Sequence, residues 1–194
     1  MVIAIDGPAG AGKSTVARAV ASALGYRYLD TGAMYRAVTL AALRTGIGSE
    51  DGDALADLAG LAATMSDDPD LRSPEVDRCV SLVARHPPLR AALHRAQRAY
   101  LAEGDAVAEG RDVGAVVWPE AELKIWLDAA PGERAKRRVR EQGDAAAAAA
   151  LAERDQRDSA QTVRAPDAVV IDTTELPTDA VIDRIVSLAK AAAA

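Results

Sequence analysis

The feature that most constrains the fold is a glycine-rich stretch near the N-terminus. Residues 7–14 read Gly-Pro-Ala-Gly-Ala-Gly-Lys-Ser and match the pattern G-x-x-x-x-G-K-[ST] without a gap. Residues 2–6 before it form an apolar run that predicts a buried strand, and residues 13–24 after it have helical character until Gly25. A strand, a glycine-rich loop and a helix in this order are typical of a phosphate-binding loop.

The loop predicts the chemistry of nucleotide binding. Its glycines let successive backbone N–H groups point at phosphate oxygens, and the start of the helix adds its positive end. We expect Lys13 to reach the β- and γ-phosphates of ATP, and the Ser14 hydroxyl to ligate Mg²⁺. A glycine-rich turn that only opens a helix is the simpler alternative, and the flanking strand and helix argue against it. The predicted ATP-binding residues are Gly7, Pro8, Ala9, Gly10, Ala11, Gly12, Lys13, Ser14 and Thr15.

Strand-like runs alternate with helical patterns along the rest of the chain. Further strands are expected over 26–29, 106–109, 123–127 and 168–172. Helices are expected over 34–44, 53–65, 88–103, from 131 onward, over the alanine run 145–150, and over 179–190. The polar stretch 66–74 with its two prolines is interpreted as a linker or surface excursion. This alternation predicts an α/β fold of one domain over 1–194, a P-loop NTPase three-layer sandwich whose parallel five-stranded sheet has helices on both faces.

Composition excludes several classes of function. A net charge of −6 argues against a surface that binds nucleic acid, and no apolar run is long enough to span a bilayer. The single cysteine, Cys79, excludes an internal disulfide, and together with two histidines it cannot form a four-ligand zinc site. Asp6 interrupts the first apolar run too early for a signal peptide. We therefore expect a cytoplasmic monomer with no nucleic-acid or membrane partner.

The phosphate loop predicts nucleotide binding but does not identify the reaction, so the evidence for the reaction has to come from other segments. A guanine-nucleotide switch would need an Asn-Lys-x-Asp element to read the base, and this sequence contains no asparagine. A carboxylate that assists Mg²⁺ could be Glu109 or Asp128, because each ends a strand-like run, and spacing alone does not separate them.

Arginines near predicted strand ends indicate phosphoryl transfer. Arg36 and Arg111 follow turn-like glycines at places where a parallel sheet presents ligands, and two more arginines lie within residues 154–158. Guanidinium groups hold phosphates in a bidentate manner and stabilise charge as it spreads during transfer. A phosphate acceptor needs no strong general base. Solvated helix faces are the simpler interpretation for three other arginines, Arg137, Arg138 and Arg140.

Four segments together resemble the bacterial cytidylate kinases, which phosphorylate CMP and dCMP. They are residues 5–15, the Leu-Asp-Thr-Gly-Ala-Met-Tyr-Arg of 29–36, the Glu-Gly-Arg-Asp-Val-Gly of 109–114, and the Glu-Arg-Asp-Gln-Arg-Asp-Ser of 153–159. The resemblance implies transfer of the γ-phosphoryl group of ATP to CMP or dCMP with Mg²⁺. Another P-loop small-molecule or nucleoside monophosphate kinase, or a non-catalytic ATP-binding regulator, remains the alternative.

The resemblance also implies roles for single residues. Arg36 and Arg111 would hold the acceptor phosphate, with Thr31 nearby. Ser81, Arg90 and Asp112 would read the cytosine edge. Arg154 and Asp158 would lie in or beside a helical lid over about 133–161 and contact the ribose and phosphates. The implied catalytic set is Lys13, Arg36, Arg111 and Arg154.

Two departures from the family pattern are visible. The acceptor-binding insert, placed at about 66–90, is shortened, since residues 66–70 leave little room for the longer segment of the family. Gln161 stands where the family usually has a third lid arginine. Either Arg164 replaces that arginine or one phosphate contact is lost.

Overall fold

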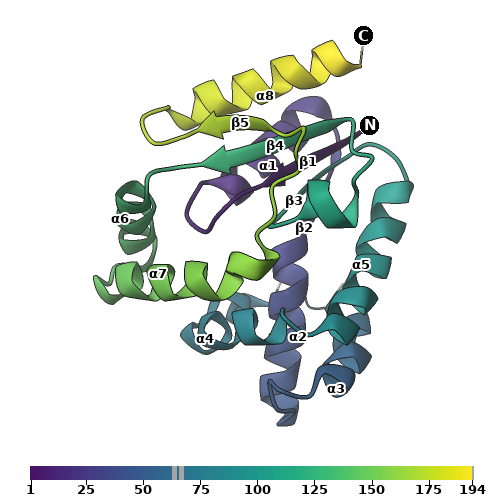
Figure 1. Cartoon of the computed structure of the whole chain (residues 1–194), viewed down its shortest axis with the longest axis vertical. Coiled ribbons are helices and arrows are strands. Elements are labelled where there is room, and N and C mark those ends of the chain that lie inside the picture. Colours follow the sequence, from purple (N-terminus) through teal and green to yellow (C-terminus); the bar gives the residue numbers. More distant parts are fainter. Residues whose placement is uncertain (63–64, 66–67, 194) are drawn as a thin grey trace. The chain divides into compact units, whose positions relative to one another are not determined.

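The computed structural model describes residues 1–62, 65 and 68–193, which form two compact units (Figure 1). The first unit comprises Met1–Leu29 and Glu103–Ala194, and the second comprises Asp30–Ala102. The expected lid at 133–161 belongs to the first unit and the expected insert at 66–90 to the second. The organisation as one domain with these two parts stays a prediction.

A five-stranded sheet forms the centre of the first unit, with the order β2-β3-β1-β4-β5. β1 pairs in parallel with β3 and β4, and β4 pairs in parallel with β5. Every residue of β1 is buried, as its continuous apolar run requires. All five predicted strands are confirmed, with bounds of β1 Val2–Asp6, β2 Arg27–Asp30, β3 Ala106–Gly110, β4 Leu123–Asp128 and β5 Val169–Asp172.

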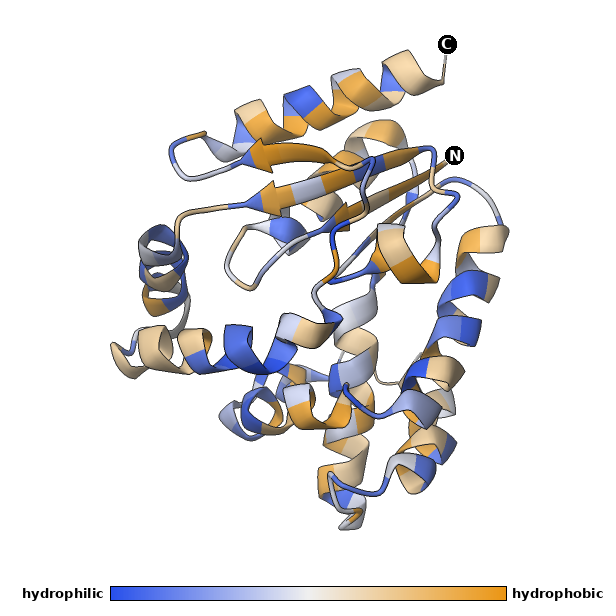
Figure 2. Ribbon diagram, viewed as in Figure 1, coloured by the Kyte–Doolittle hydropathy of each residue, from blue (hydrophilic) through white to orange (hydrophobic). Residues whose placement is uncertain are grey.

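Two helices cover one face of this sheet. Ile3 and Ile5 of β1 share a core with Val20 of α1 (Lys13–Leu24) and Ile185 of α8 (Thr178–Ala192). Figure 1 shows α8 running along β4 and β5, and Figure 2 shows both strands as mainly apolar. Ala4 points to the other face, where a turn of π-helix at Val113–Val117 packs so closely that a side chain on Gly114 would lie 3.3 Å from the Ala4 Cβ.

Two further helices of the first unit coincide with the predicted lid. They are α6 Pro131–Gln142 and α7 Ala146–Asp158. The alanine run opens α7, as alanine's helix propensity predicts, and Figure 2 shows the helix becoming hydrophilic toward its C-terminal end.

The second unit is helical. Its elements are α2 Thr31–Thr45, α3 Gly52–Asp57, α4 Pro74–Val83 and α5 Pro87–Ala102, with 3₁₀ turns at Leu58–Ala62 and Pro69–Arg72. Val38, Leu55, Val76 and Leu93 lie in its core. α2 begins three residues earlier than predicted, because the Asp30 carboxylate accepts a hydrogen bond from the Ala33 N–H at 2.8 Å and caps the helix.

The sequence prediction failed between residues 53 and 83. The helix expected over 53–65 ends at Asp57 and continues as a 3₁₀ turn to Ala62, and residues 63–64 lie outside the described residues. Residues 66–67 of the expected linker also lie outside them, but its later part folds as a 3₁₀ turn that buries Leu71. The helix α4 was missed. Its signals were Ser73, which caps the helix, Pro74 in the first turn, and the buried valines at 76, 80 and 83.

Substitution of Gly7 by alanine tests the close packing of the phosphate loop on β4. Gly7 has φ +150°, and a Cβ there would lie 2.0 Å from the carbonyl oxygen of Leu127. Because this oxygen belongs to a sheet backbone, we expect Gly7→Ala to lower the free energy of unfolding in urea by about 3 kcal/mol. Gly132→Ala is the matched control, since nothing lies within 4 Å of its added methyl group. Equal stability of the two variants would contradict the packing.

Candidate functional site

The loop between β1 and α1 holds its own lysine in place. Lys13 begins α1, is only 8% exposed, and donates a hydrogen bond from Nζ to the Pro8 carbonyl oxygen at 2.8 Å. The pKa of Lys13 is lowered to about 7, chiefly by burial and further by the positive charges of Arg111 and Arg154, while the charges of Glu109 and Asp6 oppose the shift. A single extra negative charge beside Nζ would therefore shift its protonation.

A buried carboxylate ties β1 to the segment that follows β3. The two oxygens of Asp6 accept hydrogen bonds from the backbone N–H groups of Val113 and Gly114, each at 2.8 Å. The pKa of Asp6 is raised to about 6, chiefly by burial and also by the charge of Asp112, while the two hydrogen bonds and the charge of Lys13 oppose the rise. Asp6 therefore positions the predicted motif at 109–114 next to the phosphate loop. The sequence indicated Asp6 only as the end of a strand.

Two predicted phosphate-binding arginines share one carboxylate. Arg111 donates from Nη2 to Oδ2 of Asp158 at 3.2 Å and from Nη1 to the Gly7 carbonyl oxygen at 3.1 Å. Arg154 forms an ion pair with the same Asp158 oxygen, its Nε lying 3.4 Å away. The structure therefore brings together the loop, Arg111, Arg154 and Asp158. Asp112, also predicted for the site, is buried directly after Arg111.

The structure distinguishes Glu109 from Asp128, the two carboxylates that sequence spacing left as equal candidates to assist Mg²⁺. Glu109 is 3% exposed, accepts a hydrogen bond from the Tyr28 hydroxyl at 2.5 Å, and its charge acts on Lys13. Asp128 is exposed and accepts a bond from the next backbone N–H, that of Ala129, at 2.8 Å. Glu109 is thus the carboxylate close enough to influence the phosphate-loop lysine.

Sequence reasoning missed Arg134 of α6. This side chain is 8% exposed and donates to the carbonyl oxygens of Ala9 at 3.0 Å and Ala129 at 3.1 Å, and to the carboxylate of Asp155. It therefore links the phosphate loop to α7. No sequence signal distinguishes Arg134 from the arginines around it, because its burial depends on how α6 packs.

A neighbouring arginine also differs from the expectation of a solvated helix face. Arg137 donates from Nη2 to the carbonyl oxygen of Thr173 at 2.5 Å and from Nη1 to its hydroxyl at 3.0 Å. Arg140, by contrast, is exposed, as expected.

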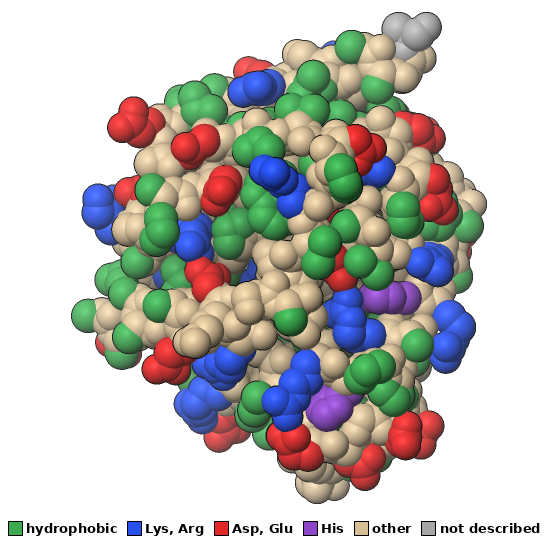
Figure 3. Space-filling model, viewed as in Figure 1, with side chains coloured by type: hydrophobic (Ala, Val, Ile, Leu, Met, Phe, Trp, Pro, Cys, Tyr) green, Lys and Arg blue, Asp and Glu red, His purple; other side chains and the backbone are tan. Residues whose placement is uncertain are grey.

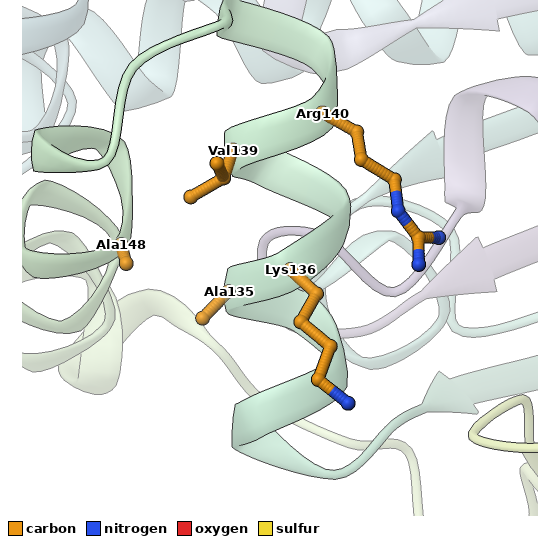
Figure 4. Close-up of a pocket in the computed structure, with 5 residues that line it drawn as sticks. All are labelled: Ala135, Lys136, Val139, Arg140 and Ala148. Atoms are coloured by element: carbon orange, nitrogen blue, oxygen red, sulfur yellow. The ribbon is translucent and has the colours of Figure 1, made fainter.

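Figure 4 shows Lys136 and Arg140 extending from α6 on one side, while Val139 points toward Ala148 of α7. The shallow apolar hollow there is lined by Ala135, Lys136, Val139, Arg140 and Ala148.

The remaining predicted residues lie in the second unit. Arg36 of α2 is 7% exposed and donates to the Leu71 carbonyl oxygen at 3.0 Å and to Asp77 at 2.6 Å. The Arg90 guanidinium lies 5.9 Å from the centre of the Tyr35 ring. Thr31 begins α2 and Ser81 lies on α4, and both are buried.

The model of the cytidylate kinase family matches residues 3–191 of this chain. The chain belongs to the cytidylate kinase family. It is 45% identical to a cytidylate kinase of Exiguobacterium sibiricum, with 98% of this chain and 97% of that protein covered. That comparison extends over 216 residues whereas this chain has 194, so at least 22 positions of the relative have no counterpart here.

Two further comparisons concern a longer relative and a solved structure of low sequence identity. A bifunctional pantoate ligase/cytidylate kinase of Synechococcus sp. is 46% identical over 96% of this chain, and the chain spans 40% of the length of that protein. A gluconokinase of Sinorhizobium meliloti has a TM-score of 0.57 at 17% identity, with 98% of this chain and 93% of the other covered. The predicted P-loop α/β fold is confirmed.

Acidic and basic side chains are interspersed over the face shown in Figure 3. Among the described residues, no helix is both long and apolar enough to cross a membrane.

Nucleotide binding by this cytidylate kinase family member should take up a proton above neutral pH. Since the pKa of Lys13 is about 7 without ligand, its amine is mostly neutral above that pH, and adjacent phosphates would raise the pKa and restore the charge. We expect ADP binding to take up close to one proton at about pH 8.5 and almost none at about pH 6, with affinity falling as pH rises. Titration calorimetry in buffers of different ionisation enthalpy measures this uptake. Equal uptake at both pH values, or uptake that survives Lys13→Met, would contradict the assignment.

Loss of Arg134 should destabilise the first unit. Arg134→Ala leaves the carbonyl oxygens of Ala9 and Ala129 and the Asp155 carboxylate without this donor. The expected fall in the free energy of unfolding is about 2–3 kcal/mol, less than for a fully buried pair because the Asp155 side chain is 28% exposed. Urea denaturation measures it, and Arg140→Ala on the exposed side of α6 is the control. A change no larger than that of the control would remove Arg134 from the link between loop and α7.

Proposed function

We propose that this chain is a cytidylate kinase that transfers the γ-phosphoryl group of ATP to CMP or dCMP, which yields ADP and CDP or dCDP. The observation that carries the proposal is the match of the family model over residues 3–191. The cluster of Lys13, Arg111 and Arg154 beside the phosphate loop supports it, because a crowded pair of phosphates needs several fixed cations.

In the proposed reaction, an oxygen of the acceptor phosphate attacks the γ-phosphorus of ATP. The bond between that phosphorus and the β–γ bridging oxygen breaks, and ADP leaves with the electron pair. Lys13 would exchange its hydrogen bond to Pro8 for the transferring phosphoryl group, where its charge stabilises the transition state more than bound ATP. No general base is required because the attacking oxygen is already anionic.

Arg111 and Arg154 would also change partners. Both are paired with Asp158 in this structure, so their charges are partly neutralised before any nucleotide arrives. Phosphate oxygens accept bidentate bonds from guanidinium groups and carry more charge than one carboxylate. We propose that phosphates take the place of Asp158 on these arginines and that Asp158 then contacts the ribose. The lid over about 133–161 would close by this exchange.

Mg²⁺ would be held by the Ser14 hydroxyl together with nucleotide phosphates and water. The donor set fits this mode, because among the described residues no group of three or more His, Cys, Asp or Glu side chains could cage a metal. The ion would neutralise charge on the β- and γ-phosphates. Glu109, rather than Asp128, is the carboxylate proposed to orient its water ligands.

For the acceptor, we propose that Arg36, with Thr31 nearby, binds the phosphate of CMP, and that Ser81, Arg90 and Asp112 read the cytosine. Asp112 can accept from the 4-amino group, while Arg90 can donate to N3 or O2. The shortened insert, the cytoplasmic location and the monomeric state stay predictions. At least 22 positions of the Exiguobacterium protein have no counterpart here, as a shortened insert requires.

An assay of ADP release with CMP, dCMP, UMP, AMP and shikimate tests the proposal. We expect CMP and dCMP to be used with kcat/KM roughly tenfold or more above the other acceptors, because fixed donors and acceptors reject the wrong base edge. Lys13→Ala, which should lower kcat by about a hundredfold or more, controls for a contaminating kinase. Preference for another acceptor would assign a different small-molecule kinase. ADP binding without turnover of any acceptor would assign a regulator.

A further inference from the structure

Helix α5 carries a buried amide that has no partner in the part of the chain the structure describes. Gln97 is 1% exposed, and neither its Nε2 nor its Oε1 makes a hydrogen bond to any described residue. Buried polar groups are nearly always paired, because an unpaired one loses its bonds to water without replacement. A buried glutamine in this state has a donor and an acceptor available to a ligand or to an ordered water.

The position of Gln97 on its helix makes the amide conspicuous. The buried residues of α5 are spaced four apart and form a stripe consisting of Leu89, Leu93, Gln97 and Leu101. Residues at this spacing lie on one face of a helix, so a leucine or methionine at 97 would continue the apolar stripe. For stability alone, the unpaired amide is the poorer choice.

Other polar groups of the same unit indicate what the amide could bind. Ser81 of α4 is 4% exposed, and its hydroxyl likewise makes no hydrogen bond to any described residue. Arg90 lies seven residues before Gln97 on α5, close to two helical turns, so both project from the same side of the helix. Arg90 and Ser81 are the residues proposed above to read cytosine. Gln97 lies on the same helix face as Arg90, and, like Ser81, it has no hydrogen-bond partner among the described residues.

We propose that Gln97 binds the base edge of the pyrimidine nucleotide acceptor. This inference rests on the proposed function. The amide Nε2 would donate to N3 of cytosine while Oε1 accepts from the 4-amino group, a pair of bonds that satisfies both unpaired atoms at once. After rotation by half a turn the same amide could serve uracil. Gln97 therefore fixes the position of the base but does not by itself select cytosine over uracil.

Replacement of the amide by an apolar side chain of similar length tests the proposal. Gln97→Met should weaken binding of CMP and of dCMP equally, by roughly tenfold, which is the effect of losing two neutral hydrogen bonds. ADP binding should not change. Without ligand, the thermal midpoint should be at or above that of the unmodified protein, because the unpaired amide is gone. Arg95→Met, on the exposed side of the same helix, is the matched control and should leave all four measurements unchanged.

Each other outcome has a defined meaning. Unchanged CMP binding in Gln97→Met would overturn the proposal, and loss of CMP binding with normal dCMP binding would assign the amide to the ribose instead of the base. If Gln97→Met lowered the thermal midpoint, Gln97→Glu, which keeps the length but removes the donor, would decide. Normal CMP binding by that variant overturns the proposal, and weakened CMP binding with normal ADP binding supports it. An unmodified protein that binds ADP but neither CMP nor dCMP would instead overturn the proposed function.

Discussion

The carboxylate of Asp6 is the interaction on which the first unit depends. It lies at the end of the central strand, where burial opposes its ionised form, and hydrogen bonds from the N–H groups of Val113 and Gly114, together with the charge of Lys13, stabilise that form. The two bonds join the start of the phosphate loop to the segment that carries Arg111. Without them, the loop and the arginine would belong to separate strand ends, and their relative position would depend on weaker contacts.

The cations beside the phosphate loop have their charges partly compensated by other groups of the protein. The cations Lys13, Arg111 and Arg154 would repel one another if left alone, and the depressed pKa of Lys13 records that repulsion together with burial. Asp158 and the carbonyl oxygens of Pro8 and Gly7 are the partners of these cations in the structure. In the proposed function, nucleotide phosphates would therefore replace existing partners of these cations instead of ordering free side chains.

The second unit differs from the phosphate site, because some of its neutral polar groups are buried without a partner among the described residues. Arg36 has its partners in Asp77 and the Leu71 carbonyl, but Ser81 and Gln97 are buried with none among the described residues. Charged groups cannot be buried unpaired, whereas neutral amides and hydroxyls can be, at a smaller cost. The residues proposed to bind phosphate are thus paired within the protein, and the groups without a partner among the described residues are neutral ones proposed to bind the base.

The sequence by itself determined the strands, most helices, the phosphate loop and the family, because these depend on local spacing: glycines at set intervals, apolar runs and capping residues. It also indicated Arg111 and the arginines of residues 154–158 from their positions near predicted strand ends, while the roles of Arg111, Arg154 and Asp158 come from the resemblance to a family and stay predictions. It missed α4, where the two prolines concealed a capped helix.

Only the tertiary structure showed that Glu109 is buried and Asp128 exposed, that Arg134 is buried against the loop, and that Gln97 has no partner among the described residues. Burial and pairing of these side chains depend on residues distant in the chain, such as Tyr28 for Glu109 and Ala9 for Arg134. No local pattern carries that information.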